Sequence, residues 1–296
     1  MNRLEDMRIF VESVDAGSFT AAAERLELSK QFVSKRVSAL EAGLGARLLI
    51  RTTRKLRVTE LGLAYYERAR GILQQVDDAE QMVASQVAEP RGLLRVAAPM
   101  SFGTMHLSPS IPDFLQRYPE VSLDLDLNDR RVDLISEGYD MALRIGKLED
   151  SSMVARRLAP LDRVICASPA YLERHGEPMS LEALRSHTCL LYGLNRSMEW
   201  DLARDGKTLS VPVSGRLRVN NGELLRDAAI AGLGLAFLPT FIIAPALADG
   251  RLVSLLDAYR PPATSIYAVY PQHRQSSLLI RSLTDFLHDR FNPDVV

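Results

Sequence analysis

The chain has 296 residues, a formal net charge of −1 and 47% hydrophobic residues. That length suits two or three domains, and the ordinary composition argues against a disordered or low-complexity protein. The N-terminus is charged and lacks a long apolar core, which is not the pattern of a secretory signal peptide. The two cysteines, Cys166 and Cys189, form no CxxC pair, and we expect core thiols in a protein of the reducing cytoplasm.

Three helices are predicted at the start of the chain. An opening helix over residues 4–15 is followed by a short helix with Thr20 as its N-cap, and then by a third helix capped by Ser29. Gly43 and Gly45 are expected to end the third helix. Its apolar residues recur at spacings of four, three and four, which predicts one buried stripe: Val33, Val37, Leu40 and Leu44.

The other face of the third helix is polar, and Glu41 is its single acid. Two short helices joined by a turn, with a polar free face on the second, are typical of a helix-turn-helix that enters the major groove of DNA. Two short strands, 48–51 and 56–58, would add a wing with its tip at 52–55. Residues 30–59 hold eight cations and one acid, a concentration of charge expected of a phosphate-binding face.

We therefore predict that residues 1–59 form a winged helix-turn-helix domain that binds double-stranded DNA. Phe32 has two interpretations, a core residue, which we favour, or a contact to a thymine methyl group. The predicted DNA-binding residues are Thr20, Ser29, Lys30, Gln31, Ser34, Lys35, Arg36, Ser38, Arg51, Thr52, Arg54 and Lys55.

A long helix is predicted from Thr59 to near Pro90, where Glu89-Pro90-Arg91-Gly92 forms a hinge. Its apolar residues form nearly a heptad seam: Tyr65, Ala69, Ile72, Val76, Ala79, Val83 and Val87. Such a seam packs either on its own chain or against a second copy. We favour a second copy, because a single winged domain reads little DNA, with Tyr65, Ile72, Val76, Ala79 and Val83 as the dimerisation residues.

Strands and helices alternate after residue 91, which indicates an α/β domain with a largely parallel sheet. We place one lobe at about 91–162 and 266–296 and a second at about 163–265. The uncharged stretch 228–248 is long enough for a membrane span, but two glycines and two prolines interrupt it. It is therefore predicted to form helix, strand and helix in a buried layer.

Ligands of open α/β sheets bind beyond the carboxyl ends of strands. Ser101 follows such an end and either offers its hydroxyl to an anion or simply caps its helix. Arg144 either clamps a carboxylate or, as we favour, pairs with Asp140, Glu149 or Asp150. Trp200 is expected in the core. The candidate effector-binding residues are Met100, Ser101, Phe102, Arg144, Asn195, Asn220 and Phe237.

Catalysis finds no support in the sequence. The five histidines are scattered, none at metal-ligand spacing, and no serine lies in a G-x-S-x-G elbow. No catalytic residue, metal or cofactor is predicted. An enzyme with a DNA-binding appendage remains an alternative without a visible active site, and a nucleoid-type structural protein would need its positive charge spread more widely.

The chain resembles the LysR-type transcriptional regulators. The N-terminal resemblance lies in GSFTAAAERL, SKQFVSKRVSALE and LGARLLIRTTRKLRVTELG, and the C-terminal one in LRVAAP, FLQRYPEVSLDL, DMALRIG, DSSMVARRL, ASPAYL and GLGLAFLP. It implies a dimerising linker helix at 60–90 and, at 91–296, a two-lobed effector domain similar to periplasmic binding proteins. It also implies a sequence-specific regulator, a homodimer or pair of dimers, that senses an organic or aromatic acid, with RNA polymerase as a further partner. Lys30-Gln31-Phe32 stands where the family often has Gln-Pro-Ala, so the base-reading chemistry is not carried over.

Overall fold

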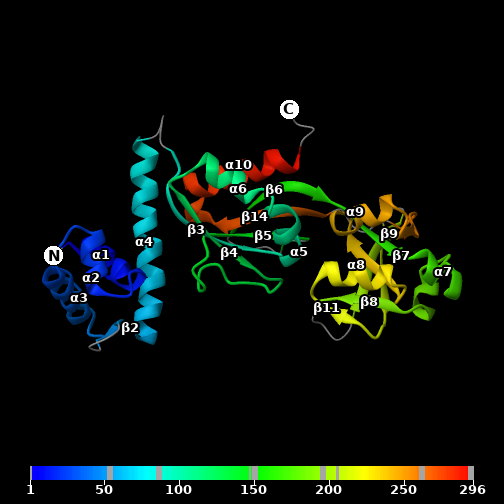
Figure 1. The fold of residues 1–296 in the computed structure, drawn as a ribbon, viewed down its shortest axis with the longest axis horizontal. Coiled ribbons are helices and arrows are strands. Elements are labelled where there is room, and N and C mark those ends of the chain that lie inside the picture. The colour runs from blue at the N-terminus through cyan, green and yellow to red at the C-terminus, as the bar shows by residue number, and fades with distance from the viewer. Residues whose placement is uncertain are drawn as a thin grey trace.

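The computed structural model describes residues 2–51, 56–84, 89–146, 148, 153–193, 198–204, 207–259 and 264–292. A small helical domain lies at one end, a long helix follows it, and two α/β lobes extend beyond that helix (Figure 1). In this part of the chain no helix has both the length and the hydropathy to cross a membrane.

The N-terminal domain contains the three predicted helices and the hairpin: α1 (Arg3–Asp15), α2 (Phe19–Arg25), α3 (Lys30–Leu44), β1 (Leu49–Arg51) and β2 (Leu56–Val58). The Ser29 hydroxyl accepts a hydrogen bond from the backbone N–H of Phe32 at 3.2 Å, which confirms the predicted cap of α3. The predicted cap at Thr20 is wrong. Ser18 has the extended backbone of a cap and accepts from the N–H of Ala21 at 3.1 Å, so Thr20 already lies inside α2.

The core of this domain contains most of the predicted stripe of α3. Val33 and Val37 are fully buried, but Leu44 is 37% exposed, because α3 ends there and Gly45 turns the chain with φ of +67°. Gly43, also predicted as an end, lies within α3. Phe32 is 39% exposed, so the favoured core interpretation was wrong.

Helix α4 (Glu60–Ala84) begins after Thr59, whose hydroxyl accepts from the N–H of Gly62 at 2.9 Å. Ala69 is buried in the core of the N-terminal domain, and Tyr65 packs edge-on against Phe10 with ring centroids 5.5 Å apart. The first two positions of the predicted seam therefore contact their own chain. Ile72 remains 41% exposed.

Lobe I contains a five-stranded sheet in the order β4-β3-β5-β14-β6. Its elements are β3 (Gly92–Ala98), α5 (Met100–Phe102), a π-helical turn (Gly103–Leu107), α6 (Ile111–Arg117), β4 (Val121–Leu127), β5 (Met141–Ile145), β6 (Met153–Leu161), β14 (Thr264–Pro271), a 3-10 turn (Gln272–Arg274) and α10 (Leu278–Phe291). The alternation of strands and helices is interrupted between β4 and β5, where residues 131–137 form no helix. Asp133 instead accepts the N–H groups of Ile135 and Ser136, and this local bonding holds a turn.

Lobe II contains a second five-stranded sheet, in the order β11-β8-β12-β7-β13, and the hairpin β9-β10. Its elements are β7 (Arg163–Ala167), α7 (Pro169–His175), a 3-10 turn (Glu182–Ser186), β8 (Cys189–Tyr192), β9 (Met198–Arg204), β10 (Lys207–Val213), β11 (Arg218–Val219), α8 (Gly222–Ile230), β12 (Leu235–Pro239), α9 (Thr240–Ala248) and β13 (Val253–Leu255). The uncharged stretch 228–248 forms the end of α8, then β12 and α9, as predicted. Trp200 is 3% exposed, which confirms a core position.

Both sheets are largely parallel, as predicted, and each contains one reversed strand. In lobe I, β14 runs antiparallel to β5 and β6, and in lobe II, β7 runs antiparallel to β12 and β13. Both exceptions follow from the path of the chain, which leaves lobe I through β6, enters lobe II through β7 and returns through β14 (Figure 1).

Candidate functional site: a polar helix face and a cavity between the lobes

The exposed face of α3 carries the polar residues that the sequence placed there. Lys30, Gln31 and Lys35 are exposed, and Ser34 and Ser38 are half-buried. Helix α3 lies on the side of the N-terminal domain that faces away from α4 (Figure 1), so neither α4 nor the lobes cover it. Thr52, Arg54 and Lys55 lie outside the described residues, and of Arg51 only its place in β1 is described.

Two charged residues on α3 have structural roles instead. The Arg36 guanidinium pairs with the Asp6 carboxylate at 2.6 Å, and Asp6 is 3% exposed. This pair ties α3 to α1 and gives Arg36 a structural role. Glu41 accepts the N–H groups of Leu48 and Leu49 at 2.8 and 3.0 Å, which explains the single acid in a basic region.

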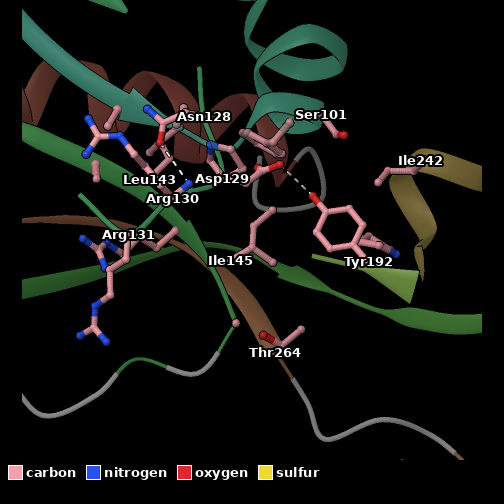
Figure 2. A pocket seen from close by; sticks show the side chains of 18 of the residues that line it. Ser101, Asn128, Asp129, Arg130, Arg131, Leu143, Ile145, Tyr192, Ile242 and Thr264 are labelled. Atoms are coloured by element: carbon pink, nitrogen blue, oxygen red, sulfur yellow. Dashed lines mark hydrogen bonds between the residues drawn. The ribbon is translucent and has the colours of Figure 1, made fainter. Parts of the chain in front are cut away.

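A cavity of about 620 Å³ lies between the lobes. Lobe I contributes the ends of β3 and β5 and the segment that follows β4, and lobe II contributes residues of β7, β8, β9, β12 and α9. Figure 2 shows several of the lining side chains. Of the predicted effector-binding residues, Ser101, Phe102, Arg144 and Phe237 line it. Met100 and Asn220 are not among its lining residues, and Asn195 lies outside the described residues.

Ser101 does not cap its own helix, α5. Its hydroxyl donates to Glu223 and accepts from the backbone N–H of Gly222 at 3.1 Å, so it caps α8 of the opposite lobe. Thr104 also donates to Glu223, at 2.7 Å. Desolvation alone would raise the pKa of Glu223, but these hydroxyl hydrogen bonds, a backbone hydrogen bond and nearby Arg226 together leave the pKa below its ordinary value.

Backbone N–H groups at the starts of α5 and α8 already have hydrogen-bond partners. The N–H of Met100 at the start of α5 donates to Asp129 at 3.1 Å. At the start of α8, Asn221 rather than Asn220 accepts from Leu224 at 2.8 Å. A bound anion would have to displace these groups to reach the backbone N–H groups, and the assignment of Ser101 and Asn220 to effector binding stays a prediction.

A second contact joins the lobes beside the cavity. The Tyr192 hydroxyl donates to the Asp129 carboxylate at 3.2 Å, and Figure 2 shows the two side chains pointing toward each other. Desolvation and the nearby carboxylate raise the pKa of Tyr192, so the hydroxyl keeps its proton. Sequence reasoning missed Asp129, although it follows the carboxyl end of β4 and so obeys the rule that selected Ser101.

Arginines outnumber acidic residues around the cavity. The charged residues among its described lining are Arg130, Arg131, Arg144 and Arg163, with Asp129 and Asp201. Arg144 donates to the carbonyl of Val132 at 2.7 Å. Of the three acids that we favoured as partners of Arg144, Asp140 instead pairs with Arg70 and Arg274, and Glu149 and Asp150 lie outside the described residues.

No catalytic or metal centre emerges from the described residues. They contain no cluster of three or more histidine, cysteine or acidic side chains able to hold a metal ion. Cys166 and Cys189 are fully buried in different core clusters, and burial raises the pKa of each thiol to about 12. His106 stacks on Phe102 at 5.2 Å, and desolvation lowers its pKa.

Comparison with known proteins covers nearly the whole chain. Residues 4–63 match the family described as "Bacterial regulatory helix-turn-helix protein, lysR family", and residues 88–292 match "LysR substrate binding domain". An uncharacterized HTH-type transcriptional regulator of Haemophilus influenzae is 36% identical, over 96% of this chain and 99% of the relative. The transcriptional activator TtdR of Escherichia coli K12 is 34% identical, over 96% and 92%.

Solved structures agree with these matches. CrgA, a LysR-type transcriptional regulator from Neisseria meningitidis, superimposes with a TM-score of 0.62 at 36% identity, over 97% of this chain and 98% of that one. Full-length AphB, a virulence activator of Vibrio cholerae, gives 0.59 at 28% identity, over 96% and 98%. Both similarities extend over the DNA-binding and the two-lobed parts together.

Proposed function

Because the chain belongs to the LysR family of transcriptional regulators, we propose that a small organic anion bound between its lobes modulates its binding to a specific operator. The observation that carries the ligand half of this proposal is the charge around the cavity, where four arginines face two aspartates among the described lining residues. A volume of about 620 Å³ is within the usual range of small-molecule sites.

The DNA half of the proposal rests on α3 and the hairpin. Lys30, Gln31 and Lys35 are exposed on one helix face, and such a face fits the major groove. The basic wing would bind phosphates, which position the protein without reading sequence. A face that holds both base-reading and phosphate-binding residues is expected to recognise a defined DNA site. Its affinity for that site should fall as the salt concentration rises.

We further propose that α4 pairs with a second copy of the chain. Leu61 is 63% exposed and Ile72 is 41% exposed, and their separation of eleven residues places them on one side of a helix. Ala79, seven residues further on, is exposed on the same side. A palindromic operator would then be bound by two DNA-binding domains.

Selection of binding sites from random DNA tests the proposal. Full-length protein is expected to enrich one imperfect palindrome, and a gel shift should favour that sequence over a scrambled one. Enrichment of no sequence would contradict operator recognition. A set of small acids added to the gel shift tests the ligand, and an unchanged shift with every anion that binds the protein would contradict modulation.

A further inference from the structure

Arg163 occupies an unusual position in the cavity. It lies at the start of β7, where the chain crosses from lobe I into lobe II, and it pairs in register with Pro239 at the end of β12. Its guanidinium lies 4.0 Å from the centroid of the Phe237 ring. One amino group is 3.5 Å from the carbonyl oxygen of Phe237, a long hydrogen bond.

The charge of Arg163 has no acidic partner at ion-pair distance in the described chain. Of the two aspartates that line the cavity, Asp129 already accepts from Tyr192 and Met100, and Asp201 accepts from the Ser210 hydroxyl at 2.9 Å. Desolvation lowers the pKa of Arg163 to about 10, and neighbouring Tyr192 and Asp201 oppose that shift only in part. A cation withdrawn from water without an anion is unfavourable for folding.

The other three cavity arginines, Arg131 included, already interact with other groups. Arg130 pairs with Glu137, and Arg144 donates to the carbonyl of Val132. Arg163 has only a ring face and one long hydrogen bond, which leaves most of its five N–H donors for something else. A carboxylate matches the planar fork of a guanidinium and can accept two of these donors at once.

We propose that Arg163 anchors the carboxylate of the molecule that binds between the lobes, and that this molecule is a monocarboxylic acid with an apolar, aromatic-sized body. This deepens the proposed function and rests on it. One unpaired guanidinium calls for one carboxylate. The apolar body follows from the neighbouring wall, which is built from Phe102, Leu143, Ile145 and Ile242.

The test uses full-length protein with benzoate and 2-naphthoate as probes, and benzamide and 2-naphthamide as their uncharged counterparts. The acids should raise the melting temperature of the wild type and the amides should not. Arg163→Met should weaken acid binding at least tenfold, the loss of a hydrogen bond to a charged group. The affinity of Arg163→Lys for the acids should lie between those of the wild type and Arg163→Met, because a lysine keeps the charge and loses the planar fork.

Arg204→Met is the matched control. Arg204 also stacks on an aromatic ring, that of Tyr259 at 5.1 Å, and it is not among the lining residues of the cavity. It should bind the acids as the wild type does. Without any acid, Arg163→Met should melt at or above the wild-type temperature, because it removes a desolvated charge.

Four results would overturn the proposal: no acid binds the wild type, the amides bind as well as the acids, Arg163→Met binds the acids normally, or Arg163→Met is less stable than the wild type without ligand. The last would make Arg163 a structural residue. Each of these leaves operator selection by the wild type untouched. Loss of operator selection would instead contradict the proposed function itself.

Discussion

The guanidinium of Arg70 on α4 lies 3.4 Å from the carboxylate of Asp140, which immediately precedes β5. The same carboxylate accepts from Arg274 at 3.0 Å and from the backbone N–H of Arg95 in β3 at 2.7 Å. Both β3 and β5 continue from this point to the cavity, through Ala97–Ala98 and 142–145. The two strands that hold α4 are therefore the strands whose far ends would contact a ligand.

A second ion pair strengthens the contact between α4 and lobe I. Glu67 pairs with Arg95 at 3.1 Å, and both side chains are mostly buried. Gly138 lies directly beneath it with φ of +71°, and a Cβ there would lie 1.9 Å from a carboxylate oxygen of Glu67. The glycine thus allows the helix to approach this closely.

The Glu67–Arg95 pair should behave as a unit. Glu67→Gln and Arg95→Gln are each expected to lower the melting temperature of the lobes, and the double variant should lose little more than the worse single one. The expected coupling is about 0.5–3 kcal/mol, typical of contacting residues. Calorimetry checks this, with Glu80→Gln at an exposed position of α4 as control. Strictly additive losses would show that the pair does not join α4 to lobe I.

Gln31 and Lys35 should read bases. Each substitution by alanine is expected to relax the preference at one operator position by about 1–3 kcal/mol. By contrast Arg54→Ala in the wing should weaken specific and non-specific binding alike and reduce the salt slope by about 0.9. Competition gel shifts at several salt concentrations measure both effects. If all three variants keep the wild-type base preference and salt dependence, this face does not read DNA.

Arg36→Ala should act on folding rather than on sequence preference. The substitution leaves Asp6 charged, buried and unpaired, which costs about 3–5 kcal/mol for a fully buried pair and less here because Arg36 is 20% exposed. Urea unfolding followed by the helical signal measures the loss. If the variant keeps wild-type stability and loses operator affinity, Arg36 is a DNA contact after all.

Ile72→Glu should dissociate the proposed dimer. Two copies of the new carboxylate would meet in a contact that excludes water, and burial of unpaired like charges is strongly unfavourable. Light scattering at micromolar concentration gives the mass. Leu63→Glu is the matched control, because Leu63 is 54% exposed on a different side of α4. A dimeric mass for Ile72→Glu would show that the contact between two copies does not involve Ile72.

The contact of Glu223 with Ser101 and Thr104 should depend on pH. Because the pKa of Glu223 is lowered in the folded protein, its stabilising effect is complete above the ordinary glutamate value of about 4.3 and is lost as pH falls through the lower folded value. Glu223→Gln should therefore be less stable than the wild type at neutral pH. In thermal melts at decreasing pH, the difference in melting temperature between the two proteins should narrow once Glu223 of the wild type becomes protonated. A difference in melting temperature that widens in acid would contradict a stabilising role of the Glu223 carboxylate.

Local patterns predicted the helix-turn-helix and the hairpin well, since caps and apolar spacing act within a few residues. The same patterns failed where the partner is distant. The spacing of apolar residues in α4 showed that Tyr65 lies on the apolar side of the helix. It did not show that Phe10 of the same chain packs against Tyr65. Ser101 was correctly located after β3, yet its bonds reach Gly222 and Glu223 in the other lobe, which no local pattern indicates.

Arg163 escaped prediction for a topological reason. Ligand-binding residues are expected after the carboxyl ends of strands, and Arg163 lies at the beginning of one. Because β7 is antiparallel to β12, its first residue reaches the same edge as the last residue of β12, Pro239. A sequence shows where strands begin, but it does not show which of them runs in reverse.

The pairing of Leu161 with Thr264 in the ladder of β6 and β14 makes lobe II an insertion into lobe I. The last residue before the excursion and the first residue after it are neighbours across two antiparallel strands. A short hairpin turn could therefore replace the whole of lobe II and leave the sheet of lobe I continuous. The resulting miniature protein would retain the surface that holds α4, and it would show whether a regulator stripped of half its cavity is locked in one state.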